Sequence, residues 1–233
     1  RYLGNERLVR RVPVNATVGD ADAETTARRA VEAVENGFDC VKVKVGARSV
    51  EADADRLRRV REVVGDEVAL RADANGAWDR QQAERALDAV EPLDLEYVEQ
   101  PMPAEEVAAH AGLRNGGNEV PLALDESLAE RPVADLLAAE AADYLVLKPM
   151  ALGGPDRARN VARQARQAGV TPVISTTIDG VVARTAAVHV AAAVPEIPAC
   201  GLATADWLAE DLGPDPAPVA DGRIEVPQDK GLG

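Results

Sequence analysis

The sequence of 233 residues is short of cysteine, of basic residues and of long hydrophobic runs. Two cysteines cannot build a disulfide framework, which is typical of a protein of the reducing cytoplasm. No stretch approaches the roughly 20 apolar residues of a membrane-spanning helix, and the N-terminus has no apolar segment typical of a signal peptide. Acidic residues outnumber basic ones 40 to 26, so the net charge of −14 argues against nucleic acid as a partner.

Lysine is the scarcest of the charged residues. Only four of the 26 basic residues are lysines, namely Lys42, Lys44, Lys148 and Lys230. An acidic, lysine-poor composition is typical of proteins that stay soluble in high salt, although a GC-rich genome produces a similar bias. Because lysine is so scarce, a lysine inside a strand requires a specific explanation. The apolar fraction of 46% is nevertheless typical of a globular protein with a hydrophobic core.

Short apolar runs alternate with amphipathic segments along most of the chain. The runs occupy residues 12–18, 40–45, 68–72, 95–98, 122–124, 144–147, 172–174 and 200–202. Helices are predicted between them at 22–35, 49–64, from Asp79 onward, 155–168 and 181–193. Eight strands that alternate with helices predict a parallel sheet, and at this length the sheet most simply closes into a (β/α)8 TIM-type barrel. A doubly wound open sheet is the alternative, but no glycine-rich phosphate turn follows the first strand.

Carboxylates end three successive predicted strands. Asp73, Glu99 and Asp125 are each 26 residues apart, so they are expected at equivalent heights around one mouth of the barrel. An Asp at a strand end is more often a turn or cap residue when it occurs alone. Three converging carboxylates repel one another unless a cation holds them, and all-oxygen ligands favour Mg²⁺. The absence of His and Cys from these strand ends makes zinc a poor fit.

Three of the four lysines are predicted at the same mouth. Lys42 and Lys44 are two residues apart on one strand and therefore face the same side, while Lys148 ends the sixth strand. Two close ammonium groups are expected to lower each other's pKa, which would make one lysine a usable base. This pattern indicates proton abstraction beside a carboxylate, with the resulting ene-diolate stabilised by a metal. Away from the strand ends, His110 and His189 are predicted to be structural or at the surface, and Trp78 and Trp207 to be packing anchors.

The strand ends together carry a recognisable set of motifs. Lys-x-Lys at 42–44, Asp-x-Asn at 73–75, Glu-Gln-Pro at 99–101, Asp-Glu-Ser at 125–127 and Lys-Pro at 148–149 resemble the enolase superfamily, in its muconate-lactonizing-enzyme subgroup. The resemblance covers roughly residues 10–212. Residues 12–17, 70–78, 125–128, 173–179 and 201–208 are most similar to the o-succinylbenzoate synthases of that subgroup.

This resemblance implies roles for individual residues. It implies Asp73, Glu99 and Asp125 as Mg²⁺ ligands, with Mn²⁺ as a substitute, and Lys44 and Lys148 as the acid–base pair. It places four residues near a small-molecule carboxylate substrate: Lys42, Asn75, Ser175 and Gly201. The implied reaction is a Mg²⁺-dependent syn dehydration of 2-succinyl-6-hydroxy-2,4-cyclohexadiene-1-carboxylate in menaquinone biosynthesis. A homo-oligomer located in the cytoplasm is compatible with it.

Several alternatives remain open. An N-acylamino acid racemase, a dipeptide epimerase or a muconate cycloisomerase of the same subgroup would use the same carboxylates and lysines. The epimerases usually have Asp-x-Asp at the eighth strand, whereas this chain has the sequence that begins Cys200-Gly201. A Schiff-base aldolase that uses Lys148 would leave the three carboxylates without a role, and an inactive structural barrel would be expected to lack some of these groups.

The resemblance also predicts the domain organisation. Residues 1–212 are expected to form the barrel, and residues 213–233 a tail that returns to an N-terminal capping domain. That domain is absent from this sequence, and residue 1 is Arg rather than Met, so we expect the chain to be part of a longer protein.

Overall fold

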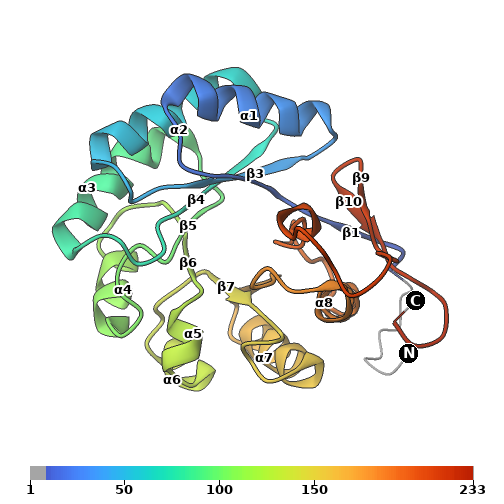
Figure 1. Cartoon of the computed structure of the whole chain (residues 1–233). Helices are drawn as coiled ribbons and strands as arrows, with labels where there is room; N and C mark the ends of the chain where they lie inside the picture. The colour runs from blue at the N-terminus through green and yellow to red at the C-terminus, as the bar shows by residue number, and fades with distance from the viewer. Residues whose placement is uncertain (1–8, 233) are drawn as a thin grey trace.

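A parallel sheet curled around a central axis forms the framework of the protein. The computed structural model describes residues 9–232. Figure 1 shows the strands at the centre, with the helices around them. The sheet runs in sequence order through β2 (Ala16–Val18), β3 (Cys40–Lys44), β4 (Ala69–Asp73), β5 (Tyr97–Glu99), β6 (Leu122–Leu124), β7 (Tyr144–Leu147) and β8 (Thr171–Ile174). All neighbouring pairs in this sheet are parallel, as the alternation of strands and helices predicts.

The five predicted helices begin at their predicted starts or one residue later, whereas no helix was predicted between residues 100 and 154. Asp22 caps α1 (Ala23–Glu35), and Ser49 caps α2 (Val50–Val64). Asp79 forms the expected capping box with Gln82 at the start of α3 (Arg80–Val90). The remaining elements of this layer are η1 (Glu91–Leu93), α4 (Val107–Arg114), α5 (Ser127–Glu130), α6 (Val133–Ala138), α7 (Pro155–Gln167), α8 (Val181–Ala193) and η2 (Ala205–Trp207).

The barrel closes through two isolated bridges rather than through a full eighth strand. Val14 pairs with Cys200, and Ser175 pairs with Gly201, both in the parallel sense. The run predicted at 200–202 is therefore strand-like only at these two residues. The run predicted at 12–18 is divided between β1 (Arg11–Pro13) and β2. Within the described residues, the single turn η2 stands where an eighth barrel helix is expected.

A small antiparallel sheet joins the two ends of the described chain. Its strands are β1, β10 (Arg223–Glu225) and β9 (Val219–Ala220), with Arg11 opposite Glu225. Gly222 has φ +63° and packs directly against the backbone of Gly37, where a side chain would collide. The tail from residue 213 thus contacts the barrel here, while its predicted return to a capping domain stays a prediction.

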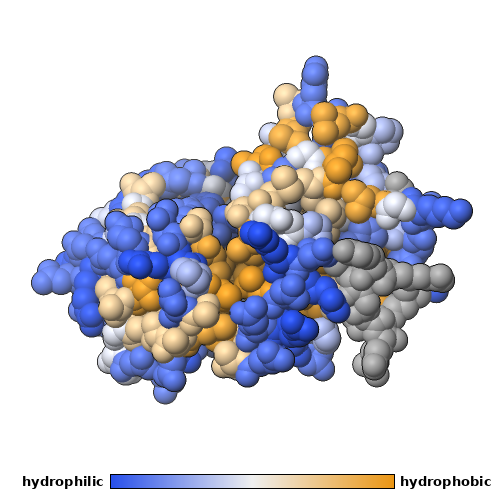
Figure 2. Space-filling view, turned by 90° about the horizontal axis from the view of Figure 1, so that it is seen from below, coloured by the Kyte–Doolittle hydropathy of each residue, from blue (hydrophilic) through white to orange (hydrophobic). Residues whose placement is uncertain are grey.

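The core lies in two layers, one between helices and sheet and one inside the barrel. The interior cluster is formed by Tyr97, Ala123, Val146 and Val173. Trp78 is buried as predicted, but Trp207, in the turn η2 that contains no buried residue, is 51% exposed, so its prediction as a packing anchor was wrong. Figure 2 shows hydrophilic residues around the margin of one face, and hydrophobic atoms both in the middle of that face and on a projection. None of the described helices is long and apolar enough to cross a membrane.

Candidate active site

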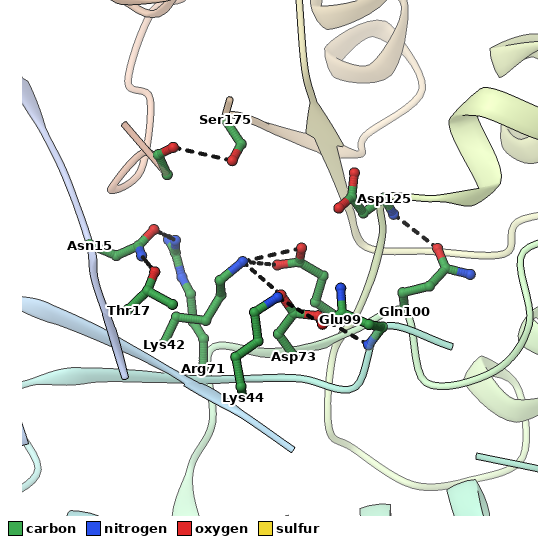
Figure 3. Close-up of polar contacts among 12 residues, drawn as sticks. Asn15, Thr17, Lys42, Lys44, Arg71, Asp73, Glu99, Gln100, Asp125 and Ser175 are labelled. Atoms are coloured by element: carbon green, nitrogen blue, oxygen red, sulfur yellow. Dashed lines mark hydrogen bonds and ion pairs between the residues drawn. The ribbon is translucent and has the colours of Figure 1, made fainter. Parts of the chain in front are cut away.

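Adjacent strands in register bring the predicted site residues together. Lys44 is the strand partner of Asp73, and Asp73 is the partner of Glu99, so three ionisable side chains lie side by side across β3, β4 and β5. Asp125 and Lys148 follow directly after β6 and β7. Figure 3 shows Lys42 and Lys44 pointing toward Asp73 and Glu99, with Asp125 farther along the same mouth. The equal sequence spacing therefore does place these groups at one edge.

Two ammonium groups neutralise the carboxylates on β4 and β5. Lys42 Nζ lies 2.9 Å from Asp73 Oδ2 and 3.0 Å from Glu99 Oε2, and Lys44 Nζ lies 2.6 Å from Asp73 Oδ2. The carboxylates are almost completely buried, whereas the side chain of Lys44 is 34% exposed. Of the two lysines on β3, Lys44 is thus the more accessible to a substrate.

Asp125 is held from two directions. Lys148 Nζ forms an ion pair with Asp125 Oδ2. The side-chain oxygen of Gln100 accepts hydrogen bonds from the backbone N–H groups of Asp125 (3.0 Å) and Ser127 (3.2 Å), which fixes the loop after β6. Sequence reasoning named Gln100 only as part of the Glu-Gln-Pro motif and gave it no role of its own. Its buried polar side chain and its positive φ of 39° mark it as a special position.

Burial and the neighbouring charges shift the pKa values of these groups in different directions. Burial raises the pKa of Glu99 to about 7, against the opposing effect of Lys42. Burial also raises the pKa of Asp125 despite its ion pair with Lys148. For Asp73, burial is outweighed by Lys42 and Lys44, which lower its pKa to about 2.

The lysines do not behave as their spacing predicts. Burial lowers the pKa of Lys42, but Glu99 and Asp73 outweigh burial and hold it well above its usual value. The spacing of the two lysines predicted a lowered pKa for Lys42, but its pKa is raised because the carboxylates of Asp73 and Glu99 contact its ammonium group directly. The pKa of Lys148 is likewise raised, since Asp125 outweighs burial.

Ser175 and Gly201 meet where the barrel closes. Ser175 Oγ donates a hydrogen bond to the carbonyl oxygen of Gly201 at 3.2 Å. A Cβ atom on Gly201 would lie 3.1 Å from the Cβ of Ser175 and would overlap its Oγ. Gly201 is therefore required by its close approach to Ser175, which Figure 3 shows across the site from Lys44.

Two further residues contribute to the surroundings of the site. Glu126, next to Asp125, accepts a hydrogen bond from Asn75 Nδ2 at 2.9 Å. Arg71, one layer below the site, is completely buried and donates from Nη1 to Asn15 Oδ1 (3.3 Å) and to the carbonyl of Ala199 (2.8 Å). The sequence signal for Arg71 was the presence of an arginine inside a predicted strand.

The donor set suits a hard cation. Within residues 9–232 no three His, Cys, Asp or Glu side chains are gathered closely enough to hold a metal ion as they stand, and lysine nitrogens contact the three predicted ligands instead. Nevertheless, Asp73, Glu99 and Asp125 are buried carboxylates on neighbouring strands, and Asp73 and Asp125 both raise the pKa of Glu99. Such a set of oxygens, which requires compensating positive charge, fits Mg²⁺.

The sequence and the fold are both shared with known enzymes. Residues 25–233 match the sequence profile of the family described as "Enolase C-terminal domain-like". The chain belongs to this family. The o-succinylbenzoate synthase of Thermobifida fusca is 40% identical over 220 residues, which is 92% of this chain and 66% of that protein. The N-succinyl-L-Arg/Lys racemase of Bacillus cereus is 34% identical over 181 residues, which is 77% of this chain and 48% of that protein.

A solved structure of the enolase-related group superimposes on the whole chain. The L-Ala-D/L-Glu epimerase from Bacillus subtilis, in a substrate-liganded complex, matches with a TM-score of 0.92 and 28% identity, covering 100% of this chain and 65% of that one. The barrel fold of the enolase superfamily is thereby established for this protein. The chain spans less than two thirds of the length of each of these three relatives.

Proposed function

We propose that the protein is an o-succinylbenzoate synthase. The proposal is carried by one observation, the 40% identity to the T. fusca synthase over 92% of this chain. Lys44 and Lys148, which contact two different buried carboxylates at one barrel mouth, supply the acid–base groups that the reaction needs. The substrate would be 2-succinyl-6-hydroxy-2,4-cyclohexadiene-1-carboxylate, and the product o-succinylbenzoate would enter menaquinone biosynthesis.

The proposed reaction is a syn dehydration in which one lysine serves twice. Lys44, as the amine, removes the proton from the ring carbon that carries the carboxylate, and the electrons pass into that carboxylate as an ene-diolate. The Lys44 ammonium then gives the proton to the hydroxyl on the adjacent carbon, the carbon–oxygen bond breaks, and water leaves. The loss of water makes the ring aromatic. Lys148 remains protonated throughout and stabilises the negative charge of the intermediate, which its raised pKa favours.

The charged groups around the lysines have separate proposed roles. Asp73, Glu99 and Asp125 would hold Mg²⁺, which when bound supplies positive charge for the substrate carboxylate. Lys42 keeps its proton, since its pKa is well above the usual value, and is proposed to orient the substrate electrostatically. Ser175 and Gly201 are proposed to line the opposite side of the substrate, at the point where the barrel closes.

An α-proton racemase or epimerase is the second candidate. It is favoured by the 34% identity to the B. cereus racemase and by the fit to the B. subtilis epimerase. In that reaction one lysine removes an α-proton and the other returns a proton on the opposite face. The two lysines on separate carboxylates could support either course, so the substrate has to be tested directly.

The deciding experiment is ultraviolet-monitored dehydration of the cyclohexadiene precursor by the protein at its full encoded length. We expect turnover with Mg²⁺, none in EDTA, and none in Lys44→Ala. Asp55→Asn, which changes a carboxylate on the exposed face of α2, is the matched control and should retain activity. If folded protein does not turn over the precursor but exchanges the α-proton of N-succinyl amino acids, the racemase proposal replaces the synthase proposal.

A further inference from the structure

The side-chain amide of Asn75 links Lys44 to a carboxylate on another loop. Lys44 Nζ donates to Asn75 Oδ1 at 2.7 Å, and Asn75 Nδ2 donates to Glu126 Oε1 at 2.9 Å. The connection begins on β3, passes through the loop after β4 and ends after β6, so it spans the mouth above Glu99. Both polar atoms of the amide are thus engaged by protein groups.

The backbone holds Asn75 in place for this contact. Its φ of 47° lies in the left-handed region, which Asn tolerates better than most residues, and its N–H donates to Asp73 Oδ1 at 3.2 Å. The next residue, Gly76, donates to the carbonyl of Gln100 at 2.7 Å. The turn is therefore tied to both β4 and the loop after β5, and it presents the Asn75 amide at a defined position.

Among the described residues, the side chain of Glu126 makes no other hydrogen bond, although its backbone carbonyl accepts from Ala129 N–H at 3.0 Å. Its Oε1 accepts from Asn75, while its Oε2 is buried and has no hydrogen-bond partner. Its backbone has ordinary helical angles (φ −60°, ψ −31°), so no special conformation requires this residue. Partial burial of a carboxylate costs free energy. The one hydrogen bond that the Glu126 side chain makes in return holds the amide of Asn75 in place.

The geometry at Lys44 explains why its orientation matters. A lysine side chain is flexible, and the Lys44 side chain is one third exposed, so a single ion pair with Asp73 would leave its nitrogen free to rotate. The two hydrogen atoms of the amine form can be given to Asp73 Oδ2 and Asn75 Oδ1. The tetrahedral nitrogen then has its lone pair in the one remaining direction, in which it can accept a proton.

We propose that Asn75 and Glu126 are positioning residues that orient Lys44 for proton transfer, and that Asn75 acts in this way rather than by contacting the substrate. This inference rests on the proposed function of Lys44 as the base. A displacement of about 1 Å at a catalytic group can lower a rate about 100-fold, so a small loss of order at Lys44 is enough to be measured.

Four variants of the full-length protein test the inference. Asn75→Gly removes the amide and tolerates the positive φ, Glu126→Met removes the acceptor, and Glu126→Gln keeps an oxygen that can accept from Asn75. Asn118→Ala is the matched control, because Asn118 Nδ2 makes a comparable bond to Asp88 Oδ1 at 3.3 Å far from the site. For each variant, kcat, KM and the isotope effect with substrate deuterated at the abstracted position are measured.

We expect Asn75→Gly and Glu126→Met to lower kcat by about 10- to 100-fold with KM changed by less than about threefold. The isotope effect on kcat should rise, because proton transfer becomes slower than the other steps. Glu126→Gln should restore most of the activity, and Asn118→Ala should behave as wild type. An increase in KM with unchanged kcat in Asn75→Gly would overturn the inference, since it would show that Asn75 binds substrate.

Crystal structures of wild type, Asn75→Gly and Glu126→Met supply a second readout that does not require turnover. We expect one conformer of Lys44 in wild type and several in both variants. If wild type fails to dehydrate the precursor, the proposed function fails while this readout still decides the positioning role. A single, unchanged Lys44 conformer in both variants would refute that role.

Discussion

Lys42 and Glu99 form a buried ion pair in which one ammonium contacts both carboxylate oxygens, at 3.2 and 3.0 Å. The same ammonium reaches Asp73, so a single positive charge serves two carboxylates on neighbouring strands. Burial of this group is costly, and the cost appears in the pKa of Glu99, which rises to about 7 although Lys42 opposes the rise. The metal-free site is therefore sensitive to pH.

Glu99 should make the metal-free protein less stable as the pH rises. Between its usual pKa of 4.5 and its folded-state value of about 7, the folded state keeps a proton that the unfolded state has lost. The free energy of unfolding contributed by Glu99 therefore falls across this window, by a few kcal/mol at most. The lowered pKa of Asp73 acts in the opposite direction but only between about 2 and 3.8. Urea unfolding of wild type and Glu99→Gln in EDTA, from pH 4.5 to 7.5, would show the difference, and parallel curves would contradict it.

Metal binding should stabilise the folded protein and should depend on the three carboxylates. A ligand present at about 100 times its Kd stabilises a protein by about 2.7 kcal/mol, so Mg²⁺ is expected to raise Tm above the value in EDTA. Asp125→Asn should remove most of this rise, because it removes a charged ligand and leaves Lys148 unpaired. Asp55→Asn, at the exposed surface, should retain the full rise. Equal shifts in the two variants would argue against Asp125 as a ligand.

Arg71 should be needed for closure of the barrel. Its guanidinium lies over the ring of Tyr97, at 4.6 Å from the centroid, and its nitrogens bond to Glu96, Asn15 and the carbonyl of Ala199. Arg71→Met leaves the buried Asn15 and the partly buried Glu96 and Ala199 without this donor, which should cost about 2–4 kcal/mol of unfolding free energy. Removal of Arg48, whose ion pair with Asp20 is exposed, is the control.

The control should cost about 1 kcal/mol or less, because exposed ion pairs contribute little. Denaturant unfolding of both variants supplies the comparison. Hydrogen exchange at Gly201 should also increase in Arg71→Met, since its N–H bond to Ile174 helps to close the barrel. Similar losses of stability in the two variants would show that Arg71 has no special role there.

Gly201→Ala should be tolerated only when the side chain of Ser175 is also removed. The added Cβ would overlap Ser175 Oγ, so the single substitution is expected to cost about 1–3 kcal/mol through overpacking. Adding Ser175→Gly removes the two atoms that crowd the new Cβ and leaves only the Cα of residue 175 at 3.6 Å, so the double variant should be more stable than the sum of the single effects. Thermal unfolding of the two single variants and the double variant tests this coupling, and strict additivity would contradict it.

Much of the fold was predictable because local signals and sequence spacing agree. The caps Asp22, Ser49 and Asp79 begin their helices as predicted, since capping depends on a few neighbouring atoms. The regular spacing of Asp73, Glu99 and Asp125 also survives in three dimensions, because one repeat unit separates parallel strands. Closure at residue 200 was less predictable, because the bridges there depend on partners far away along the chain.

The sequence by itself determined which chemical groups face one end of the barrel, because strand order, period and register follow from local pattern. Only the tertiary structure decided how those groups meet. The raised pKa of Lys42 depends on carboxylates 31 and 57 residues away, and the link from Lys44 through Asn75 to Glu126 depends on turns that converge across three strands. Distances of this kind depend on long-range packing, and electrostatic interactions change steeply with them, so spacing along the chain could not predict them.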